Sequence, residues 1–177
     1  MRSQRYSRDT IKDMPIRVAV LTVSDKGARG ERVDTAGPAV GEVVGRIGAT
    51  VLETAVLPDE VASISLQLRR WCDEGNIDLV LTTGGTGLSP RDVTPEATLE
   101  VAERLVPGLA ELMRAEGLKS TPMASLSRAV VVTRGHTLIV NLPGSERGAR
   151  ESLEAVLSLL PHAVELLQGD AGESHPV

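Results

Sequence analysis

A strand-like run that leads through a glycine-rich turn into a helix start is the feature that most constrains the fold of this chain. Residues 77–81 (Ile-Asp-Leu-Val-Leu) have the length and β-branched content of a buried strand. Residues 82–87 then read Thr-Thr-Gly-Gly-Thr-Gly, and a helix is expected to follow with Thr94 as its N-cap and Pro95 at its first position. A strand joined to a helix in this way is the building unit of a parallel sheet covered by helices.

The glycine turn also has the chemistry of an anion-binding site. Gly84, Gly85 and Gly87 let the backbone bend sharply and approach a ligand, so that N–H groups can point at an anion, and Arg91 and Asp92 add charge a few residues later. Neither standard nucleotide pattern fits, because no Lys follows the glycines and their spacing is not G-x-G-x-x-G. The local sequence supports an anion site without naming the anion, and a plain tight connection is the alternative.

Composition favours the same fold and excludes several classes of partner. The chain has 177 residues and is 41% hydrophobic, which suits one soluble globular domain. Tyr6 and Trp71 are its only aromatic residues, so the core must consist of Val, Leu, Ile and Ala, as in a parallel sheet covered by helices. The lack of aromatics argues against base stacking on single-stranded nucleic acid. A net charge of −5 argues against general attraction to nucleic acid or an anionic membrane.

Cysteine usage and hydropathy point to a cytoplasmic protein. Cys72 is the only cysteine, so the chain cannot form an internal disulfide, and no spaced Cys/His set for zinc is present. We interpret Cys72 as a buried, inert thiol beside Trp71. No apolar run approaches the roughly 20 residues of a membrane span, and the N-terminus lacks the apolar core of a signal peptide.

The hydrophobic periodicity predicts a three-layer α/β/α sandwich with a mainly parallel sheet. We expect strands over residues 16–23, 51–57, 77–81, 129–133 and 137–141, and helices over 35–46, 61–71, 95–105, 109–114, 151–160 and 163–167, with a short helical turn at 123–126. The last two strands should form an antiparallel hairpin, because only Arg134, Gly135 and His136 join them. Residues 27–34 are expected to be a mobile loop. We divide the chain into a flexible N-terminal tail (1–15), one domain (16–169) and a C-terminal tail (170–177).

Four loops should meet at the edge of the sheet where its parallel strands end. They contain Ser24 and Asp25, then residues 58–60 with Asp59, then residues 83–92 with Asp92, and finally residues 141–145. Carboxylate oxygens beside phosphate-binding amides are what a Mg²⁺–polyphosphate site requires. Asp59 has an equally plausible structural role as a helix cap, and the local sequence leaves both open.

Other polar residues carry weaker signals. His136, His162 and His175 share no spacing that indicates a metal site or a catalytic base, and we interpret each as a surface residue. Ser145 is not in a G-x-S-x-G sequence, which argues against a serine hydrolase. We expect Ser145 to be the N-cap of the helix that follows it.

Three ordered motifs resemble those of the molybdopterin-binding MogA/MoaB family of molybdenum cofactor biosynthesis. They are Thr-Thr-Gly-Gly-Thr-Gly at 82–87 with Arg-Asp-Val-Thr-Pro-Glu-Ala at 91–97, Leu-Pro-Asp-Glu at 57–60, and Asn-Leu-Pro-Gly at 141–144. The resemblance covers roughly residues 16–169. It implies the MogA-like α/β/α fold, a homotrimer, and the adenylylation of molybdopterin by Mg-ATP with release of pyrophosphate.

The resemblance also implies roles for individual residues. Asp59 and Asp92 would be the catalytic pair, acting through Mg²⁺ and the ATP phosphates. The substrate-binding residues would be Ser24, Asp25, Thr83, Gly84, Gly85, Thr86, Gly87, Asn141, Leu142, Pro143, Gly144 and Ser145. The product could pass to a separate molybdate-insertion protein. The alternative is a non-catalytic molybdopterin-binding or scaffolding protein, although such a protein would not need both aspartates.

Overall fold

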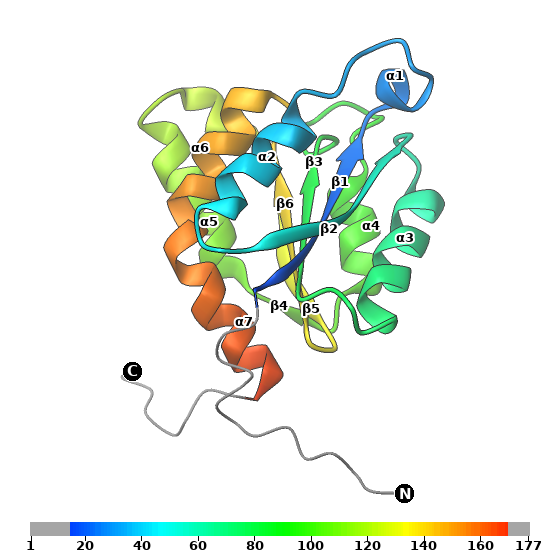
Figure 1. Cartoon of the computed structure of the whole chain (residues 1–177). Helices are drawn as coiled ribbons and strands as arrows, with labels where there is room; N and C mark the ends of the chain where they lie inside the picture. The colour runs from blue at the N-terminus through cyan, green and yellow to red at the C-terminus, as the bar shows by residue number, and fades with distance from the viewer. Residues whose placement is uncertain (1–14, 170–177) are drawn as a thin grey trace, which may run out of the picture.

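Strands rich in Val, Leu and Ile form a six-stranded sheet at the centre of the computed structural model, which describes residues 15–169 (Figure 1). The strands are β1 (Arg17–Val23), β2 (Thr50–Leu57), β3 (Leu79–Thr83), β4 (Arg104–Leu105), β5 (Val131–Arg134) and β6 (Thr137–Leu142). Their order in the sheet is β2-β1-β3-β6-β5-β4. Neighbours among β2, β1, β3 and β6 pair in parallel, whereas β5 pairs antiparallel with both β6 and β4.

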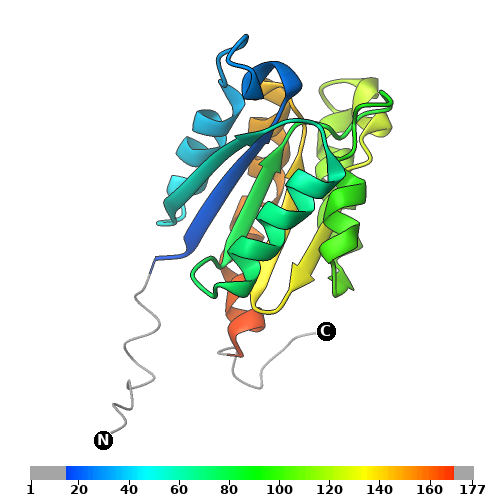
Figure 2. The ribbon, with the colours of Figure 1, turned by 90° about the vertical axis from the view of Figure 1, so that its right-hand side faces the viewer.

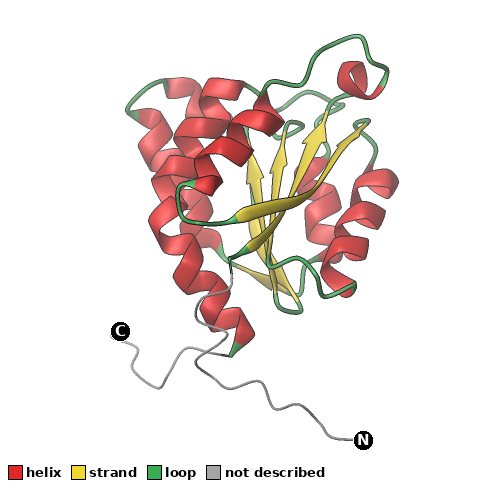
Figure 3. Cartoon of the chain, in the orientation of Figure 1, coloured by secondary structure: helices red, strands yellow, loops and turns green. Residues whose placement is uncertain are grey.

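Helices cover both faces of this sheet, which explains why its central strands are buried throughout and mostly apolar (Figures 2 and 3). Helices α2 (Ala36–Gly45), α5 (Pro107–Leu118), α6 (Glu146–Val156) and α7 (Leu160–Gln168) pack on one face, and α3 (Val61–Asp73) and α4 (Thr94–Val101) on the other. Every residue of β3 and β6 is buried. The edge strand β2 instead alternates exposed and half-buried residues.

Two apolar clusters fill the space between the layers. Along β1, Val18 and Val20 face the α2 side, while Ala19 and Leu21 face the α3 side, as the two-residue period of a strand requires. Trp71 lies in the second cluster, 1% exposed, and its indole nitrogen donates to the Glu53 carboxylate at 2.7 Å. The predicted three-layer sandwich with its mainly parallel sheet is therefore confirmed.

Several local predictions are also confirmed. β5 and β6 form the expected antiparallel hairpin, closed by Gly135 with φ +54°. The Ser145 side chain accepts a hydrogen bond from the Gly148 amide at 3.1 Å, so Ser145 is the N-cap of α6. Cys72 is 8% exposed, and burial raises the pKa of its thiol to about 11, which makes it a poor nucleophile.

Other expectations were wrong in detail. Thr94 is the first residue of α4 rather than its N-cap, because its hydroxyl donates to the Gly84 carbonyl at 2.8 Å instead of capping the helix. Leu105 lies in strand β4, where pairing with β5 supplies the backbone hydrogen bonds that a continued helix would have supplied. The start of the expected 27–34 loop belongs to a short helix, α1 (Asp25–Ala28), which Ser24 caps.

The two predicted tails fall almost entirely outside the described residues, as do Tyr6 and His175. His136 and His162 are both exposed. The Nδ1 atom of His136, in the turn between β5 and β6, lies 2.6 Å from the Leu167 carbonyl oxygen. Within residues 15–169, no helix is long and apolar enough to cross a bilayer.

Candidate functional site

Four loops meet at the upper edge of the sheet, where the parallel strands end (Figure 1). They follow β1, β2, β3 and β6, and register aligns Thr22 of β1 with Thr83 of β3, and Thr83 with Leu142 of β6. The loops begin at Ser24, Pro58, Gly84 and Pro143. The predicted convergence of the aspartate loops and glycine turns at one edge is what the structure shows.

Close packing of backbone segments explains the glycines in the turn after β3. Gly84 has φ +99°, and a Cβ atom there would lie 2.2 Å from the Val23 carbonyl oxygen. Gly85 has φ +63°, and a Cβ atom there would meet the Thr94 hydroxyl at 2.4 Å and Asp59 Oδ1 at 3.1 Å. A Cβ atom on Gly144 would lie 3.1 Å from Gly84 Cα. Any side chain at Gly84 or Gly85 would push the strand ends or the aspartate away.

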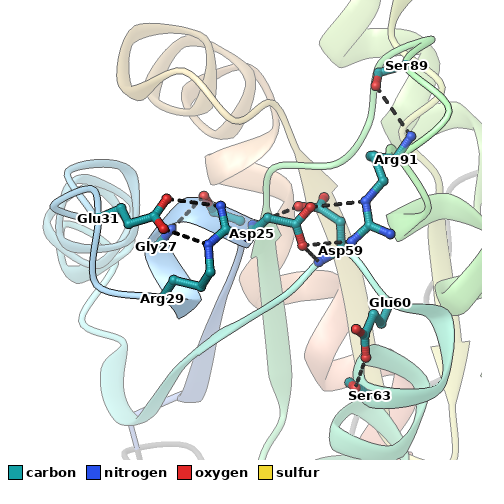
Figure 4. A network of polar contacts seen from close by, with 10 residues as sticks. Asp25, Gly27, Arg29, Glu31, Asp59, Glu60, Ser63, Ser89 and Arg91 are labelled. Atoms are coloured by element: carbon teal, nitrogen blue, oxygen red, sulfur yellow. Dashed lines mark hydrogen bonds and ion pairs between the residues drawn. The ribbon is translucent and has the colours of Figure 1, made fainter.

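Asp25 and Asp59 join two of these loops by a reciprocal pair of hydrogen bonds (Figure 4). The Asp25 amide donates to Asp59 Oδ2 at 2.9 Å, and the Asp59 amide donates to Asp25 Oδ1 at 3.0 Å. Arg91 reaches across from the glycine loop and binds the Asp25 carboxylate through Nε at 3.0 Å and Nη2 at 2.8 Å. Residues from three separate βα connections are thus held together at this edge.

The structural alternative for Asp59 is wrong, because its carboxylate does not cap the following helix. Glu60 occupies the N-cap position of α3 and makes no side-chain capping bond. Asp59 instead projects toward the glycine turn and toward Asp25.

The charge around Asp59 is unbalanced. Partial burial, followed by the negative charges of Asp25 and Asp92, raises the pKa of the Asp59 carboxyl above its ordinary value. The Arg91 guanidinium lowers the pKa of the Asp25 carboxyl. One carboxylate is therefore neutralised by an arginine, whereas Asp59 faces like charges that a bound cation would relieve.

Asp92 lies near the end of the same loop, just before α4, and its carboxylate holds the loop by a hydrogen bond. Its Oδ2 accepts from the Ser89 amide at 3.0 Å, and a Cβ atom on Gly87 would lie 2.8 Å from that oxygen. The Asp92 charge is close enough to raise the pKa of Asp59. The two aspartates expected to act as a pair therefore lie at the same edge of the molecule, as the sequence predicted.

A cavity of about 430 Å³ opens beside the glycine turn. Its rim includes Gly85, Thr86, Gly87 and Asp92, together with residues 143–145 from the loop after β6. Its opposite wall is largely apolar and comes from α5 and the 3-10 helix η2 (Pro122–Leu126), with Met113, Met123 and Leu126. The aspartate pair Asp25–Asp59 lies outside this cavity, so the edge combines a part-apolar cavity with a neighbouring charged cluster.

Some of the predicted site residues have side chains that make hydrogen bonds or core contacts within the protein, although Asn141 also lines the cavity. The Thr83 hydroxyl donates to the Pro143 carbonyl at 2.6 Å and is buried. Asn141 is 0% exposed; its side chain donates to the Thr82 and Thr98 hydroxyls and accepts from the Val130 amide. Leu142 belongs to the core on the α6 side. Ser24 uses its hydroxyl to cap α1.

Arg128 and Thr94 are two residues at this edge that the sequence did not indicate as part of the site. Thr94 holds the Gly84 carbonyl, and Arg128 binds the Gly87 and Asp92 carbonyls from the connection before β5. Arg128 is not part of any recognisable sequence motif, and it lies 36 positions after Asp92 in the chain. Only the tertiary fold brings it to the glycine loop.

Comparison with known proteins agrees with this geometry. The family model described as a probable molybdopterin binding domain matches residues 19–162. The chain belongs to this family. A molybdopterin adenylyltransferase of Helicobacter pylori (strain J99) is 43% identical over 157 residues, which cover 88% of this chain and 89% of that protein.

Two further relatives differ in how much of their own length is matched. The crystal structure of the molybdopterin biosynthesis enzyme MoaB from Thermus thermophilus superimposes with a TM-score of 0.83 at 59% identity, covering 87% of this chain and 97% of that one. The molybdenum cofactor synthesis protein cinnamon of Drosophila melanogaster is 42% identical over 88% of this chain, which spans only 26% of the fly protein. The fold resemblance expected from the three motifs is therefore confirmed.

Proposed function

We propose that this protein is a molybdopterin adenylyltransferase of molybdenum cofactor biosynthesis. Membership of the molybdopterin-binding family and the names of relatives that match most of the chain support this activity. The structural observation that carries it is the meeting of a glycine turn, a part-apolar cavity and three aspartates at one edge of the sheet. The substrates are molybdopterin and ATP, and the products are adenylyl-molybdopterin and pyrophosphate.

The reaction is a displacement at the α-phosphorus of ATP. A terminal phosphate oxygen of molybdopterin forms a new P–O bond to that phosphorus, the bond to the bridging oxygen of the β-phosphate breaks, and pyrophosphate leaves. The protein forms no covalent bond in this step. It positions the two phosphates and stabilises the negative charge.

The glycine turn and the cavity provide the pterin side of this arrangement. Backbone amides of Gly85, Thr86 and Gly87 would hold the pterin phosphate, because these three residues lie at the cavity rim. The Gly84 amide instead donates to the Leu142 carbonyl at 3.2 Å and fixes the start of the turn. Thr86, Gly144 and Ser145 line the same cavity, whose apolar wall suits a ring system. Asn141 and Thr83 keep these loops in place from below.

The aspartates provide the nucleotide side. Asp59 and Asp92 would hold Mg²⁺, a hard cation that prefers carboxylate oxygens and that, when bound, neutralises phosphate charge. The raised pKa of Asp59, caused by burial and by its acidic neighbours, indicates negative charge suited to such a cation. Within residues 15–169, no three His, Cys, Asp or Glu side chains are arranged so that they could hold a metal ion together. Phosphate oxygens and water would therefore complete the coordination shell, as is usual for Mg²⁺.

Assembly and location follow as further parts of the proposal. We expect a homotrimer, and the exposed side chains of Leu52 and Val56 on edge strand β2 offer apolar surface for contact between subunits. Cytoplasmic location suits an enzyme that consumes ATP, and a molybdate-insertion protein would receive the adenylylated product. Sedimentation equilibrium of the wild-type protein measures the assembly directly.

Release of pyrophosphate from molybdopterin and Mg-ATP is the decisive measurement. We expect the wild-type protein to release it and the Asp59→Asn and Asp92→Asn variants to lose about 100-fold or more in rate, because each loses a carboxylate that positions the phosphates. Fluorescence titration with molybdopterin should give the same dissociation constant for Asp59→Asn as for wild type, since Asp59 lies outside the cavity. Pterin binding without pyrophosphate release by the wild type would favour a non-catalytic binding protein instead.

A further inference from the structure

Arg128 binds two backbone carbonyls of the glycine loop, the connection of residues 84–93 between β3 and α4. Its Nε donates to the Gly87 carbonyl at 2.7 Å, and its Nη2 donates to the Asp92 carbonyl at 2.6 Å. Its Nη1 pairs with the Glu96 carboxylate in the first turn of α4, and its own amide donates to the Thr86 carbonyl at 2.9 Å. One residue therefore joins the middle of this loop, at Thr86 and Gly87, to its end at Asp92 and to the helix that follows.

A planar guanidinium suits this task in a way that an ammonium group does not. The three acceptors lie around Arg128, and a fork of fixed N–H directions can bind them together, whereas a lysine offers one point of charge on a flexible chain. The Arg128 side chain is 33% exposed, so its contacts are only partly screened by water.

The segment that carries Arg128 is itself held from the opposite side. Arg114 of α5 donates through Nη1 to the Ser127 carbonyl at 3.4 Å and to the Ala129 carbonyl at 3.0 Å, the two residues that flank Arg128. Ser127, Ala129 and Arg114 also line the cavity. The cavity wall and the loop that bears Asp92 are therefore joined through one short connection.

We propose that Arg128 is a positioning residue for adenylyl transfer, which holds Asp92 and the glycine turn in their working arrangement. This inference rests on the proposed function for its kinetic consequence. Arg128 acts through the backbone carbonyls of Gly87 and Asp92 and is not assigned contact with substrate. Loss of the guanidinium frees the middle and the end of the loop, so the Asp92 carboxylate and the turn amides no longer share one geometry.

Arg134, the last residue of β5, provides a matched control for Arg128, which lies in the connection just before that strand. Its Nε and Nη2 bind the Asp73 carboxylate at 2.8 and 2.9 Å, and its Nη1 donates to the Val101 carbonyl at 3.3 Å. Its side chain is 24% exposed, and its carboxylate partner is on α3, away from the glycine loop. Arg134→Gln thus removes a comparable set of contacts without touching the site.

The experiment compares Arg128→Gln, Arg128→Lys and Arg134→Gln with wild type for pyrophosphate release over a range of Mg²⁺ concentrations. We expect Arg128→Gln to lower kcat about 100-fold, as a misplacement of about 1 Å can do, and to raise the Mg²⁺ concentration needed for half-maximal rate. Arg128→Lys should lie between Arg128→Gln and wild type. Arg134→Gln should keep both the wild-type kcat and the wild-type Mg²⁺ dependence, even if its melting temperature falls.

Amide hydrogen exchange gives a readout that does not depend on activity. The Asp92 amide donates to Ser89 and the Thr94 amide to Gly85, so both amides report whether the loop is closed. We expect faster exchange at these amides in both Arg128 variants and unchanged exchange in Arg134→Gln. If Arg128→Gln does not fold, Arg128→Lys supplies the same comparison.

The outcomes separate this inference from the proposed function. Wild-type protein that releases no pyrophosphate contradicts the proposed function, while loop exchange still tests the anchoring by Arg128. Wild-type turnover with Arg128 variants that match Arg134→Gln in kcat, Mg²⁺ dependence and exchange overturns the positioning role alone. A fall in melting temperature without a change in Mg²⁺ dependence would likewise make Arg128 a structural residue only.

Discussion

Both ends of the sheet have aspartates beside an arginine, but the negative charge is fully paired at the lower end and only partly paired at the upper end. At the lower end, Asp78 is 5% exposed and accepts from the amide, Nε and Nη2 of Arg17 and from Gln168. At the upper end, Asp59 is only half-buried, and the charges of Asp25 and Asp92 face it. A closed and satisfied network stabilises the fold, whereas an incompletely balanced one leaves negative charge for a ligand to neutralise.

Substitution of a glycine by alanine should give the largest difference in stability loss between the two ends of the sheet. At the upper end, Gly84→Ala combines a positive φ with a Cβ atom 2.2 Å from the Val23 carbonyl oxygen. We expect the free energy of unfolding to fall by about 3–4 kcal/mol, as the sum of the two strain effects. At the lower end, Gly135→Ala has the same φ problem but no atom within 4 Å, and should cost about 1–2 kcal/mol. Urea denaturation measures both, and equal losses would contradict a packed backbone at Gly84.

Removal of the lower aspartate should cost stability without affecting the reaction. Asp78→Ala leaves the Arg17 guanidinium and amide without their acceptor. We expect a loss of about 3 kcal/mol, at the low end for breaking a buried ion pair, because Arg17 is 34% exposed and can turn toward water. The rate of pyrophosphate release per folded molecule should stay at the wild-type value. A selective loss of rate would show that the lower network also shapes the site.

Removal of the Asp59 carboxylate at the upper end should lower the rate of the reaction but slightly stabilise the protein. In Asp59→Asn, the amide oxygen can still accept from the Asp25 backbone, while the repulsion from Asp25 and Asp92 disappears. We expect the melting temperature to rise by no more than about 4 °C, because water screens much of the repulsion at this half-buried carboxylate. Differential scanning calorimetry without Mg²⁺ tests this. A lower melting temperature would mean that the carboxylate is a structural acceptor, like Asp78.

The smallest effect is the pH dependence of that stabilisation. Because folding raises the pKa of Asp59, its ionisation opposes folding, and its unfavourable contribution grows as pH rises from the ordinary aspartate value of about 3.9 through the folded pKa. The difference in melting temperature between Asp59→Asn and wild type should be near zero below that range and constant at neutral pH. A difference that is largest in acid would reverse the assigned direction of the pKa shift.

The sequence predicted the upper end better than the lower one. Glycine turns and aspartates after strand-like runs are local signals, and parallel pairing brings them to one edge, so Asp25, Asp59 and Asp92 could be grouped in advance. The role of Asp59 could not be settled locally, because its contact with Asp25 joins residues 34 positions apart in the chain. Arg128 and the network around Asp78 were missed for the same reason, since their partners lie far away in the chain.

Element boundaries were harder to predict than the fold. Leu105 continues the helical spacing of the residues before it, but pairing with Val132 places it in a strand. Thr94 has the composition of a cap, yet the buried Gly84 carbonyl takes its hydroxyl. In both cases a long-range hydrogen bond outweighed a local preference, which single-residue propensities do not include.

The strand order has a consequence for how the protein is made. β6 is the last strand within residues 15–169 but lies between β3 and β5, so the middle of the sheet stays incomplete until Leu142 has emerged from the ribosome. Until then the inner side of β3 has no hydrogen-bonding neighbour, and such unpaired edges invite aggregation. Nascent chains that stop before residue 137 should therefore depend on chaperones.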